Sequence, residues 1–159
     1  MKRILFICTG NICRSPMAEA LLRHMLQKAG LDGFEVFSRG VAADDGRLMS
    51  PEAREALRAE GIDGSQHRAA SLTMADLERA DLIFVMEERH WDIVKSQFSA
   101  NYVRKTHLLK EYAGDGAPGD RDIADPYGGS PADYEACKRE IQDSLLGLFA
   151  KLKEPGNSL

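Results

Sequence analysis

The start of the chain combines a short apolar strand with a helix that begins only a few residues later, and this unit limits the possible folds most strongly. Residues Lys2 to Ile7 are typical of a buried strand, and the polar run 9–11 that follows suits a turn. Ser15 and Pro16 are a helix start signal, with Ser15 as the cap, and apolar residues then recur at helical spacing as far as Gly30. Residues 8–14 are therefore predicted to form a loop that joins a strand to a helix.

The rest of the chain repeats this alternation of strand and helix. Further strands are predicted at residues 34–38, 81–86 and 106–109, and further helices at residues 50–60, 72–79, 87–97 and 133–153. Alternation of this kind makes right-handed crossovers and a buried parallel sheet. We expect an α/β fold in which four parallel strands are flanked by helices on both faces, with long loops at residues 40–49 and 113–131.

Length and composition indicate one domain with a sizeable core. The chain has 159 residues, 43% of them hydrophobic, and no apolar run longer than a strand. We expect a single domain at residues 1–153 and a flexible tail at residues 154–159. The apolar run near the start is too short for a signal peptide, which predicts a cytoplasmic protein without a membrane span. The net charge of −4 disfavours nucleic acid as a partner.

The three cysteines, Cys8, Cys13 and Cys137, do not form a recognisable framework. Their number is odd and their spacing contains neither CxxC nor a His-rich pattern, which argues against disulfides and against a zinc site. We therefore expect reduced thiols, no metal and no cofactor. One of these thiols is free to be catalytic.

The first loop has the residues of an anion site. Cys8 stands at the carboxyl end of the first strand, where ligands bind in parallel folds, and the following helix start offers unpaired N–H groups. Arg14, six residues later, carries a planar guanidinium suited to two oxygens of one tetrahedral anion. Helix starts and nearby cations favour the thiolate form of cysteine, so we expect Cys8 to be ionised, with Ser15 donating to its sulfur. Asn11 is expected to brace the loop.

Each of these residues also has an ordinary structural interpretation. A cysteine at the end of an apolar strand is commonly a small buried hydrophobic residue. Ser15 is equally suited to be a plain helix cap and Asn11 a plain turn residue. Residue types and spacing alone leave both interpretations open.

A longer match favours catalysis. It begins with Cys8-Thr9-Gly10-Asn11-Ile12-Cys13-Arg14-Ser15-Pro16-Met17-Ala18-Glu19 and continues with Ser38-Arg39-Gly40, Gly61-Ile62-Asp63, His67-Arg68-Ala69 and Asp125-Pro126-Tyr127. In these segments, which extend over most of the sequence, the chain resembles the low-molecular-weight protein tyrosine phosphatases, bacterial type. The family's four-stranded parallel sheet agrees with the alternation described above.

The resemblance implies a hydrolase that removes phosphate from phosphotyrosine through a cysteinyl-phosphate intermediate. Cys8 would be the nucleophile and Arg14 the phosphate clamp. The implied phosphate-binding residues are Thr9, Gly10, Asn11, Ile12, Cys13 and Ser15. The expected partners are phosphotyrosine proteins, a bacterial tyrosine kinase that phosphorylates them, and inorganic phosphate or a similar oxyanion in the site.

Protonation of the leaving oxygen requires a general acid from another loop. The second long loop offers four candidates, Asp115, Asp120, Asp122 and Asp125, and residue chemistry does not choose among them. Similarity to the family's acid motif selects Asp125. By the same resemblance Tyr127 forms one wall of the slot for the substrate ring, and His67 braces the Asn of the phosphate loop, although a tyrosine packed on its own domain and a purely structural histidine are common.

The sequence also departs from the family. Members from higher organisms carry a second aromatic residue where this chain has Gly128, and another on the opposite loop where it has Ala42-Ala43-Asp44. Protein arginine phosphatases of the same family tend to carry Thr at the position of Ile12, and they are the leading alternative. Arsenate reductases need further cysteines, which residues 81–90 lack. A phosphocarrier would not need the general acid.

Cys13 has two interpretations. It is either an inert packed thiol or a resolving partner for Cys8. A disulfide between these two residues would protect an oxidised nucleophile and switch the activity off reversibly.

Overall fold

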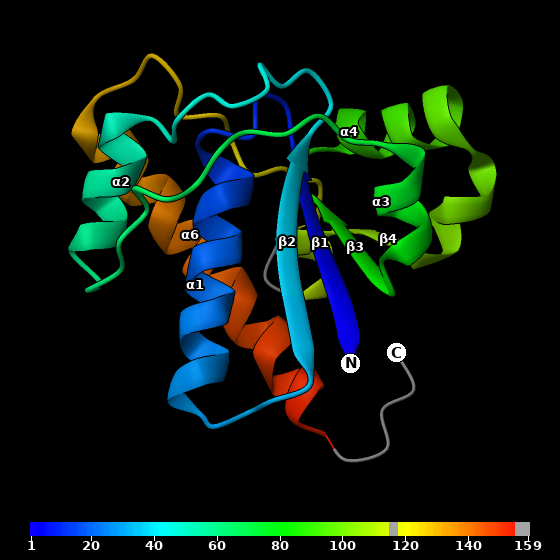
Figure 1. The fold of residues 1–159 in the computed structure, drawn as a ribbon, viewed down its shortest axis with the longest axis horizontal. Helices are drawn as coiled ribbons and strands as arrows, with labels where there is room; N and C mark the ends of the chain where they lie inside the picture. The colour runs from blue at the N-terminus through cyan, green and yellow to red at the C-terminus, as the bar shows by residue number, and fades with distance from the viewer. Residues whose placement is uncertain (115–117, 155–159) are drawn as a thin grey trace.

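Four parallel strands form one sheet in the order β2-β1-β3-β4, which confirms the predicted fold class (Figure 1). The computed structural model describes residues 1–114 and 118–154. The strands are β1 (Lys2–Cys8), β2 (Phe34–Gly40), β3 (Leu82–Val85) and β4 (Thr106–Leu108). In β1 and β3 the buried residues run without alternation, as expected for strands that are covered on both faces.

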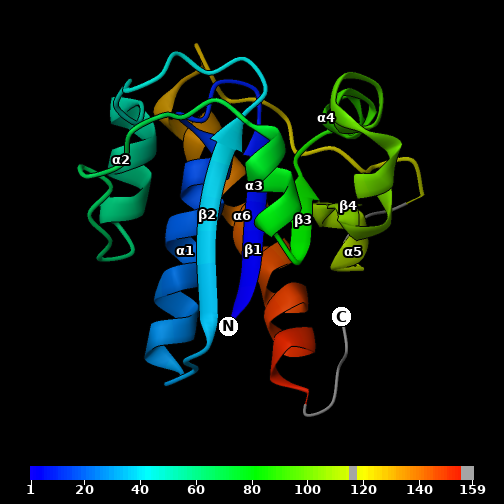
Figure 2. The same ribbon diagram turned by 45° about the vertical axis from the view of Figure 1, so that its right-hand side comes forward.

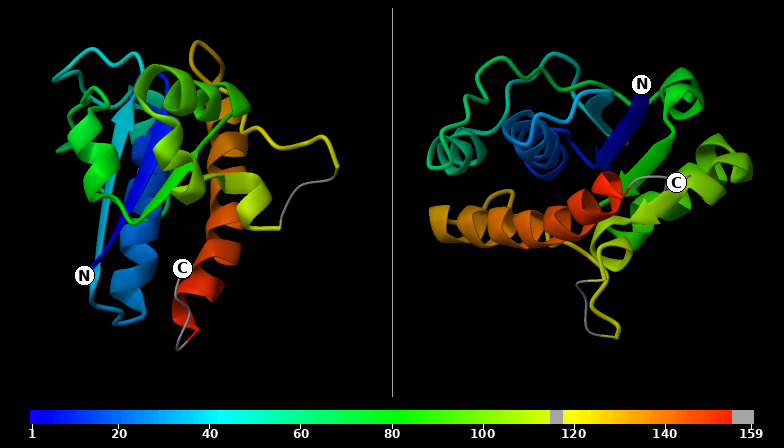
Figure 3. Two further views of the ribbon diagram at one scale, coloured as in Figure 1. Left: turned by 90° about the vertical axis from the view of Figure 1, so that its right-hand side faces the viewer. Right: turned by 90° about the horizontal axis from the view of Figure 1, so that it is seen from below.

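Helices pack on both faces of this sheet (Figure 3). Helices α1 (Arg14–Lys28) and α6 (Pro131–Lys153) lie together on one face, where Ile4 and Phe6 of β1 join them in one apolar core. Leu5 and Ile7 point to the other face, and pack there with residues of α3 (Met74–Arg79) and of the π-helical turn η1 (Val94–Phe98). The remaining elements are α2 (Pro51–Arg58), α4 (Glu88–Ile93), the 3-10 helix η2 (Ala100–Lys105) and α5 (Leu109–Tyr112).

The local structure of residues 87–112 differs in detail from the prediction. The helix expected at residues 87–97 is α4 followed by the π-helical turn η1, and η2 and α5 were not expected. The strand expected to reach Leu109 ends at Leu108, because Leu109 already begins α5. Short apolar segments are compatible with either strand or helix, so their pattern does not separate the two.

The carboxyl ends of the strands meet at one edge of the sheet (Figure 2). Cys8 lies opposite Gly40 in the register of β1 and β2, and Ile7 lies opposite Val85 in that of β1 and β3. The segments that follow these strands, residues 9–13, 41–49 and 86–87, therefore come together there, as parallel folds dictate.

Within residues 1–114 and 118–154, no helix is both long and apolar enough to cross a membrane. Residues 155–159 of the predicted tail lie outside the described residues. The domain boundary at residue 153 stays a prediction.

Candidate active site

In the loop between β1 and α1, backbone carbonyl groups accept hydrogen bonds from the protein, whereas the backbone N–H groups donate none to its described residues. The carbonyls of Cys8, Thr9 and Ile12 accept backbone bonds of 2.9 to 3.0 Å from the neighbouring segments, and that of Asn11 accepts from His67 Nε2 at 2.7 Å. Within the described chain, none of the backbone N–H groups of residues 9–13 donates to a protein acceptor. Free N–H groups at the start of a 15-residue helix are the arrangement that binds tetrahedral anions.

Asn11 organises this loop from inside. It is fully buried and has a positive φ of 56°, a conformation that asparagine tolerates better than most residues. Its Oδ1 accepts from the N–H of Ala70 at 3.0 Å, which fixes the orientation of the amide. The two protons of Nδ2 therefore go to Ser15 Oγ at 2.8 Å and Ser38 Oγ at 2.9 Å.

Ser15 lies against Cys8 instead of capping the helix. Its Oγ is 2.9 Å from Cys8 Sγ, whereas the other acceptor within reach, Arg39 O, is 3.5 Å away. Because Asn11 already donates to this oxygen, the hydroxyl proton is available for the sulfur. The predicted cap is wrong: the N-cap residue is Cys13, without a side-chain cap bond, because the Ser15 hydroxyl is used inside the loop.

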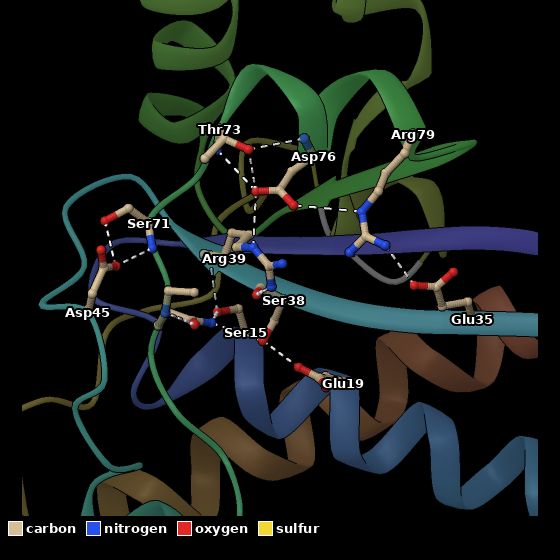
Figure 4. A network of polar contacts seen from close by, with 12 residues as sticks. Ser15, Glu19, Glu35, Ser38, Arg39, Asp45, Ser71, Thr73, Asp76 and Arg79 are labelled. Carbon is tan, nitrogen blue, oxygen red and sulfur yellow. Dashed lines mark hydrogen bonds and ion pairs between the residues drawn. The ribbon is translucent and has the colours of Figure 1, made fainter.

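The second serine extends this chain of hydrogen bonds away from the sulfur. Ser38 also accepts from Asn11, and its hydroxyl donates to Glu19 Oε2 at 2.5 Å (Figure 4). Glu19 in turn pairs with Arg23 at 2.8 Å. The proton direction is therefore the same throughout: Asn11 donates to both serines, and each serine donates onward.

Arg14 is fully buried, with its guanidinium held from three sides. Nη1 donates to the carbonyl of Ile123 at 2.8 Å and lies 3.1 Å from Glu87 Oε2. Nη2 lies 3.5 Å from Asp125 Oδ2. The sequence reasoning missed Glu87, although its position directly after the strand that ends at residue 85 was a usable signal, since parallel strands bring their following residues to one edge.

The structure distinguishes the candidate acids. Asp120 pairs with Lys110 at 2.8 Å, and Asp122 accepts from the N–H of Glu88 at 2.8 Å. Asp115 lies outside the described residues. Only Asp125, of the three that are described, lines the cavity above the phosphate loop.

That cavity has a volume of about 200 Å³. It brings together most of the residues predicted for the site: Cys8, Thr9, Gly10, Ile12, Cys13, Arg14, Asp125 and Tyr127. Asn11 and Ser15 are buried behind it, and His67 reaches only the carbonyl of Asn11. Arg47 also lines the cavity, and sequence reasoning did not predict it because arginine in a loop carries no distinct signal.

Thr9 is held by a buried histidine. The N–H of Glu87 donates to His90 Nδ1 at 3.1 Å, so the ring proton of neutral His90 lies on Nε2, which donates to Thr9 Oγ1 at 2.9 Å. Arg89 Nη2 donates to the same oxygen at 2.6 Å. Burial, together with the charge of Arg14, lowers the pKa of His90 from 6.5 to about 4, so this ring is neutral at ordinary pH.

The other two cysteines, Cys13 and Cys137, are buried. Cys13 Sγ is 3.3 Å from Ser50 Oγ and 3.5 Å from Tyr134 Oη, and burial raises the pKa of its thiol. Burial also raises the pKa of Cys137, to about 12. Both groups are therefore thiols at neutral pH.

Gly40 allows the second strand to approach the phosphate loop. A Cβ at this position would lie 2.6 Å from the carbonyl oxygen of Thr9 and 3.0 Å from Cβ of Asn11. Glycine is therefore required where β2 passes the loop. Among residues 1–114 and 118–154, no group of three or more His, Cys, Asp or Glu side chains is placed to hold a metal ion.

Comparison with known proteins agrees with this geometry. The family model described as low molecular weight phosphotyrosine protein phosphatase matches residues 3–158. A protein-arginine-phosphatase of Bacillus subtilis is 40% identical over 151 residues, which cover 95% of this chain and 97% of that protein. A probable low molecular weight protein-tyrosine-phosphatase, EpsP of Ralstonia nicotianae, is 39% identical over 156 residues, 98% of this chain and 99% of the relative.

Solved structures give the same two kinds of relative. A mutant of YwlE arginine phosphatase with a phosphorylated active-site serine superposes with a TM-score of 0.89, at 38% identity and 97% coverage of both chains. A low molecular weight protein tyrosine phosphatase from T. tengcongensis superposes with a TM-score of 0.87, at 39% identity. The superposition covers 95% of this chain and 99% of that protein.

Proposed function

Because the chain belongs to the low molecular weight protein tyrosine phosphatase family and is a hydrolase of that family, we propose that it removes phosphate from phosphotyrosine in proteins. Cys8 is the nucleophile, Arg14 the phosphate clamp and Asp125 the general acid. The observation that carries the proposal is the Ser15 hydroxyl, directed at Cys8 Sγ from 2.9 Å in a cavity that Arg14 and Asp125 also line.

In the first step the thiolate of Cys8 attacks phosphorus in line with the leaving oxygen. The S–P bond forms as the P–O bond to the tyrosine ring breaks, and Asp125 gives its proton to the departing phenol oxygen. Arg14 and the free N–H groups of residues 9–13 hold the three other phosphate oxygens. The slot for the ring is bordered by Ile12 and Tyr127.

In the second step water hydrolyses the cysteinyl phosphate. Asp125, now a carboxylate, takes a proton from the water as its oxygen attacks phosphorus, and the S–P bond breaks. Ser15 donates to the sulfur of Cys8 as it leaves with the electron pair, so the same hydroxyl assists both steps. Inorganic phosphate is released, and the starting protonation states are restored.

A second candidate function is the hydrolysis of phosphoarginine. It is favoured by the similarity to the arginine phosphatases, which is as high as that to the tyrosine phosphatases. Against it stands Ile12, which gives the cavity an apolar wall beside the substrate, as suits an aromatic ring. An arsenate reductase is less suited, because residues 81–90 carry no cysteine.

The remaining features of the proposal concern the cellular context. We place the protein in the cytoplasm, as a single catalytic domain spanning residues 1–153, with phosphoproteins of a bacterial tyrosine kinase as substrates. The loop of residues 9–13 would also bind inorganic phosphate and similar oxyanions, which would act as competitive inhibitors.

The test is phosphate release from phosphotyrosine and phosphoarginine peptides measured side by side. We expect the phosphotyrosine peptide to give the larger kcat/KM, Cys8→Ser to abolish turnover, and Asp125→Ala to lower kcat by ~10²–10⁴-fold. Ile12→Thr should move the ratio of the two kcat/KM values toward phosphoarginine. If the wild type prefers the phosphoarginine peptide, the function is hydrolysis of phosphoarginine and not of phosphotyrosine. Turnover by Cys8→Ser would refute both functions, because both require Cys8 as the nucleophile.

A further inference from the structure

Arg47 spans the mouth of the phosphate cavity. It comes from the loop after β2, and its Nη2 donates to the hydroxyl of Tyr127, on the other side, at 3.3 Å. The guanidinium carbon lies 5.8 Å from the centre of the Tyr127 ring. Both side chains are exposed and both line the cavity that has Cys8 and Arg14 at its floor. A protein substrate that places phosphate at the floor must therefore pass Arg47.

The backbone that presents Arg47 is fixed on both sides. Its carbonyl accepts from the N–H of Ala69 at 2.8 Å, and the N–H of Gly46 donates to the carbonyl of Ala69 at 2.8 Å. Asp45 Oδ1 accepts from the N–H of Ser71 at 2.6 Å and from its hydroxyl at 2.8 Å (Figure 4). The loop therefore holds the Arg47 backbone in place, while the exposed side chain is free to change partner.

The charge of Asp44, in the same loop, acts on Arg47 through space and not through a direct ion pair. Among the residues that the structure describes, no carboxylate forms an ion pair with Arg47. Two other arginines near the phosphate loop, Arg14 and Arg89, both pair with Glu87. The side-chain partner of Arg47 is the hydroxyl of Tyr127, whereas a carboxylate could accept two parallel hydrogen bonds from the guanidinium and would bring an opposite charge.

We propose that Arg47 selects substrates that carry Asp or Glu next to the phosphotyrosine. The inference rests on the proposed function. With phosphate held by Arg14 and the ring beside Tyr127, the peptide backbone of the substrate lies at the mouth, within reach of the Arg47 guanidinium. An acidic neighbour would exchange the Tyr127 hydroxyl for its own carboxylate on Arg47, whereas a basic neighbour would meet a like charge.

The experiment compares three phosphotyrosine peptides that differ only in the residues flanking the phosphotyrosine, which are Glu, Gln or Lys. For the wild type at low salt we expect kcat/KM for the Glu peptide to exceed that for the Lys peptide by about fivefold, the upper range for an exposed charge pair. The ratio should approach one at high salt. It should be near one in Arg47→Gln and inverted in Arg47→Glu.

Arg68→Gln is the matched control. Arg68 is an exposed arginine of the adjoining segment, whose Nη1 donates to the carbonyls of Ser65 and His67, and it does not line the cavity. This variant should keep the wild-type ratio. Equal rates of the wild type on all three peptides, or a preference of the wild type for the Lys peptide, would overturn the proposed role of Arg47. An unchanged ratio in Arg47→Glu would do the same. None of these results would affect the proposed phosphatase function. Failure of the wild type to hydrolyse any phosphotyrosine peptide would instead remove the proposed function.

Discussion

The Oγ of Ser15 lies 2.9 Å from Cys8 Sγ, and the amide of Asn11 determines which way the proton between them points. Because Asn11 donates to Ser15, the serine must donate in turn, and the sulfur is its nearest acceptor. The arrangement stabilises a negative sulfur, which is the reactive form of a cysteine nucleophile.

Replacement of Ser15 by Ala should therefore slow the chemistry at Cys8. We expect kcat to fall by about 10- to 100-fold, the equivalent of one charge-assisted hydrogen bond of roughly 1.5–3 kcal/mol. Alkylation of Cys8 by iodoacetamide at pH 6 should slow as well. Ser144→Ala is the control, since that buried hydroxyl has no hydrogen-bond partner in the described part of the chain. Equal alkylation rates in wild type and Ser15→Ala would show that the hydroxyl does not stabilise the thiolate.

A methyl group at residue 40 should disturb the contact between β2 and the phosphate loop. The Cβ of Gly40→Ala would lie 2.6 Å from the carbonyl oxygen of Thr9, so we expect a loss of about 1–3 kcal/mol in the free energy of unfolding, measured with urea. In Gly10→Ala the Cβ meets only Ile12 Cγ1, at an ordinary 3.6 Å. That variant should be close to the wild type in stability, and equal losses in the two would contradict the steric account.

The buried His90 should make stability depend on pH. Its pKa is lowered from 6.5 to about 4 in the folded protein, so the unfolded chain takes up the proton first as the pH falls. The contribution of neutral His90 is complete above pH 6.5 and is lost between pH 6.5 and 4, by about 3 kcal/mol in all. Urea denaturation at several pH values should show this slope in the wild type.

The His90→Gln variant separates this effect from other titrations. It should be less stable than the wild type at pH 7, because it disturbs the bond to Thr9, and the difference should shrink as the pH falls toward 4.5. His107 is the internal control, because burial lowers its pKa too. Its contribution to the pH dependence of stability is present in both the wild type and His90→Gln, and therefore cancels in the difference between them. A stability difference that stays constant with pH would show that His90 is not the titrating group.

Oxidation should inactivate the enzyme reversibly through Cys8 and Cys13. The burial that raises the pKa of Cys13 keeps it a thiol until Cys8 is oxidised to a sulfenic acid, which the thiol then attacks with loss of water. After peroxide, a dithiol should restore the activity of the wild type but not that of Cys13→Ala, because Cys8 without the disulfide is oxidised further by peroxide to a sulfinic acid, which a dithiol does not reduce. Cys137→Ala serves as control and should recover like the wild type. Equal recovery in Cys13→Ala would exclude Cys13 as the resolving residue.

Short apolar runs were sufficient to predict the strands, which are covered on both faces, and helical periodicity was sufficient to predict the large helices, which bury one face. This periodicity could not separate α4 from the π-helical turn η1, since both continue the same apolar pattern. The strand pattern before Cys8 and the helix start signal after Arg14 predicted that these two residues delimit one loop, and they are the last residue of β1 and the first of α1. Glu87 could have been found from its position after the third strand, whereas His90 and Arg47 could not, because they reach the site through local helix and loop packing, which a linear pattern does not encode.

The central claim is that phosphate passes through a covalent bond to Cys8. Its most direct test is rapid acid quenching of the enzyme during turnover of a labelled phosphotyrosine peptide, followed by mass analysis of the fragment that contains residues 8–14. We predict a phosphate on Cys8 that disappears when substrate is exhausted and is never formed in Cys8→Ala. Turnover at full rate without this phosphocysteine, or a phosphate on any other residue of the fragment, would contradict the account.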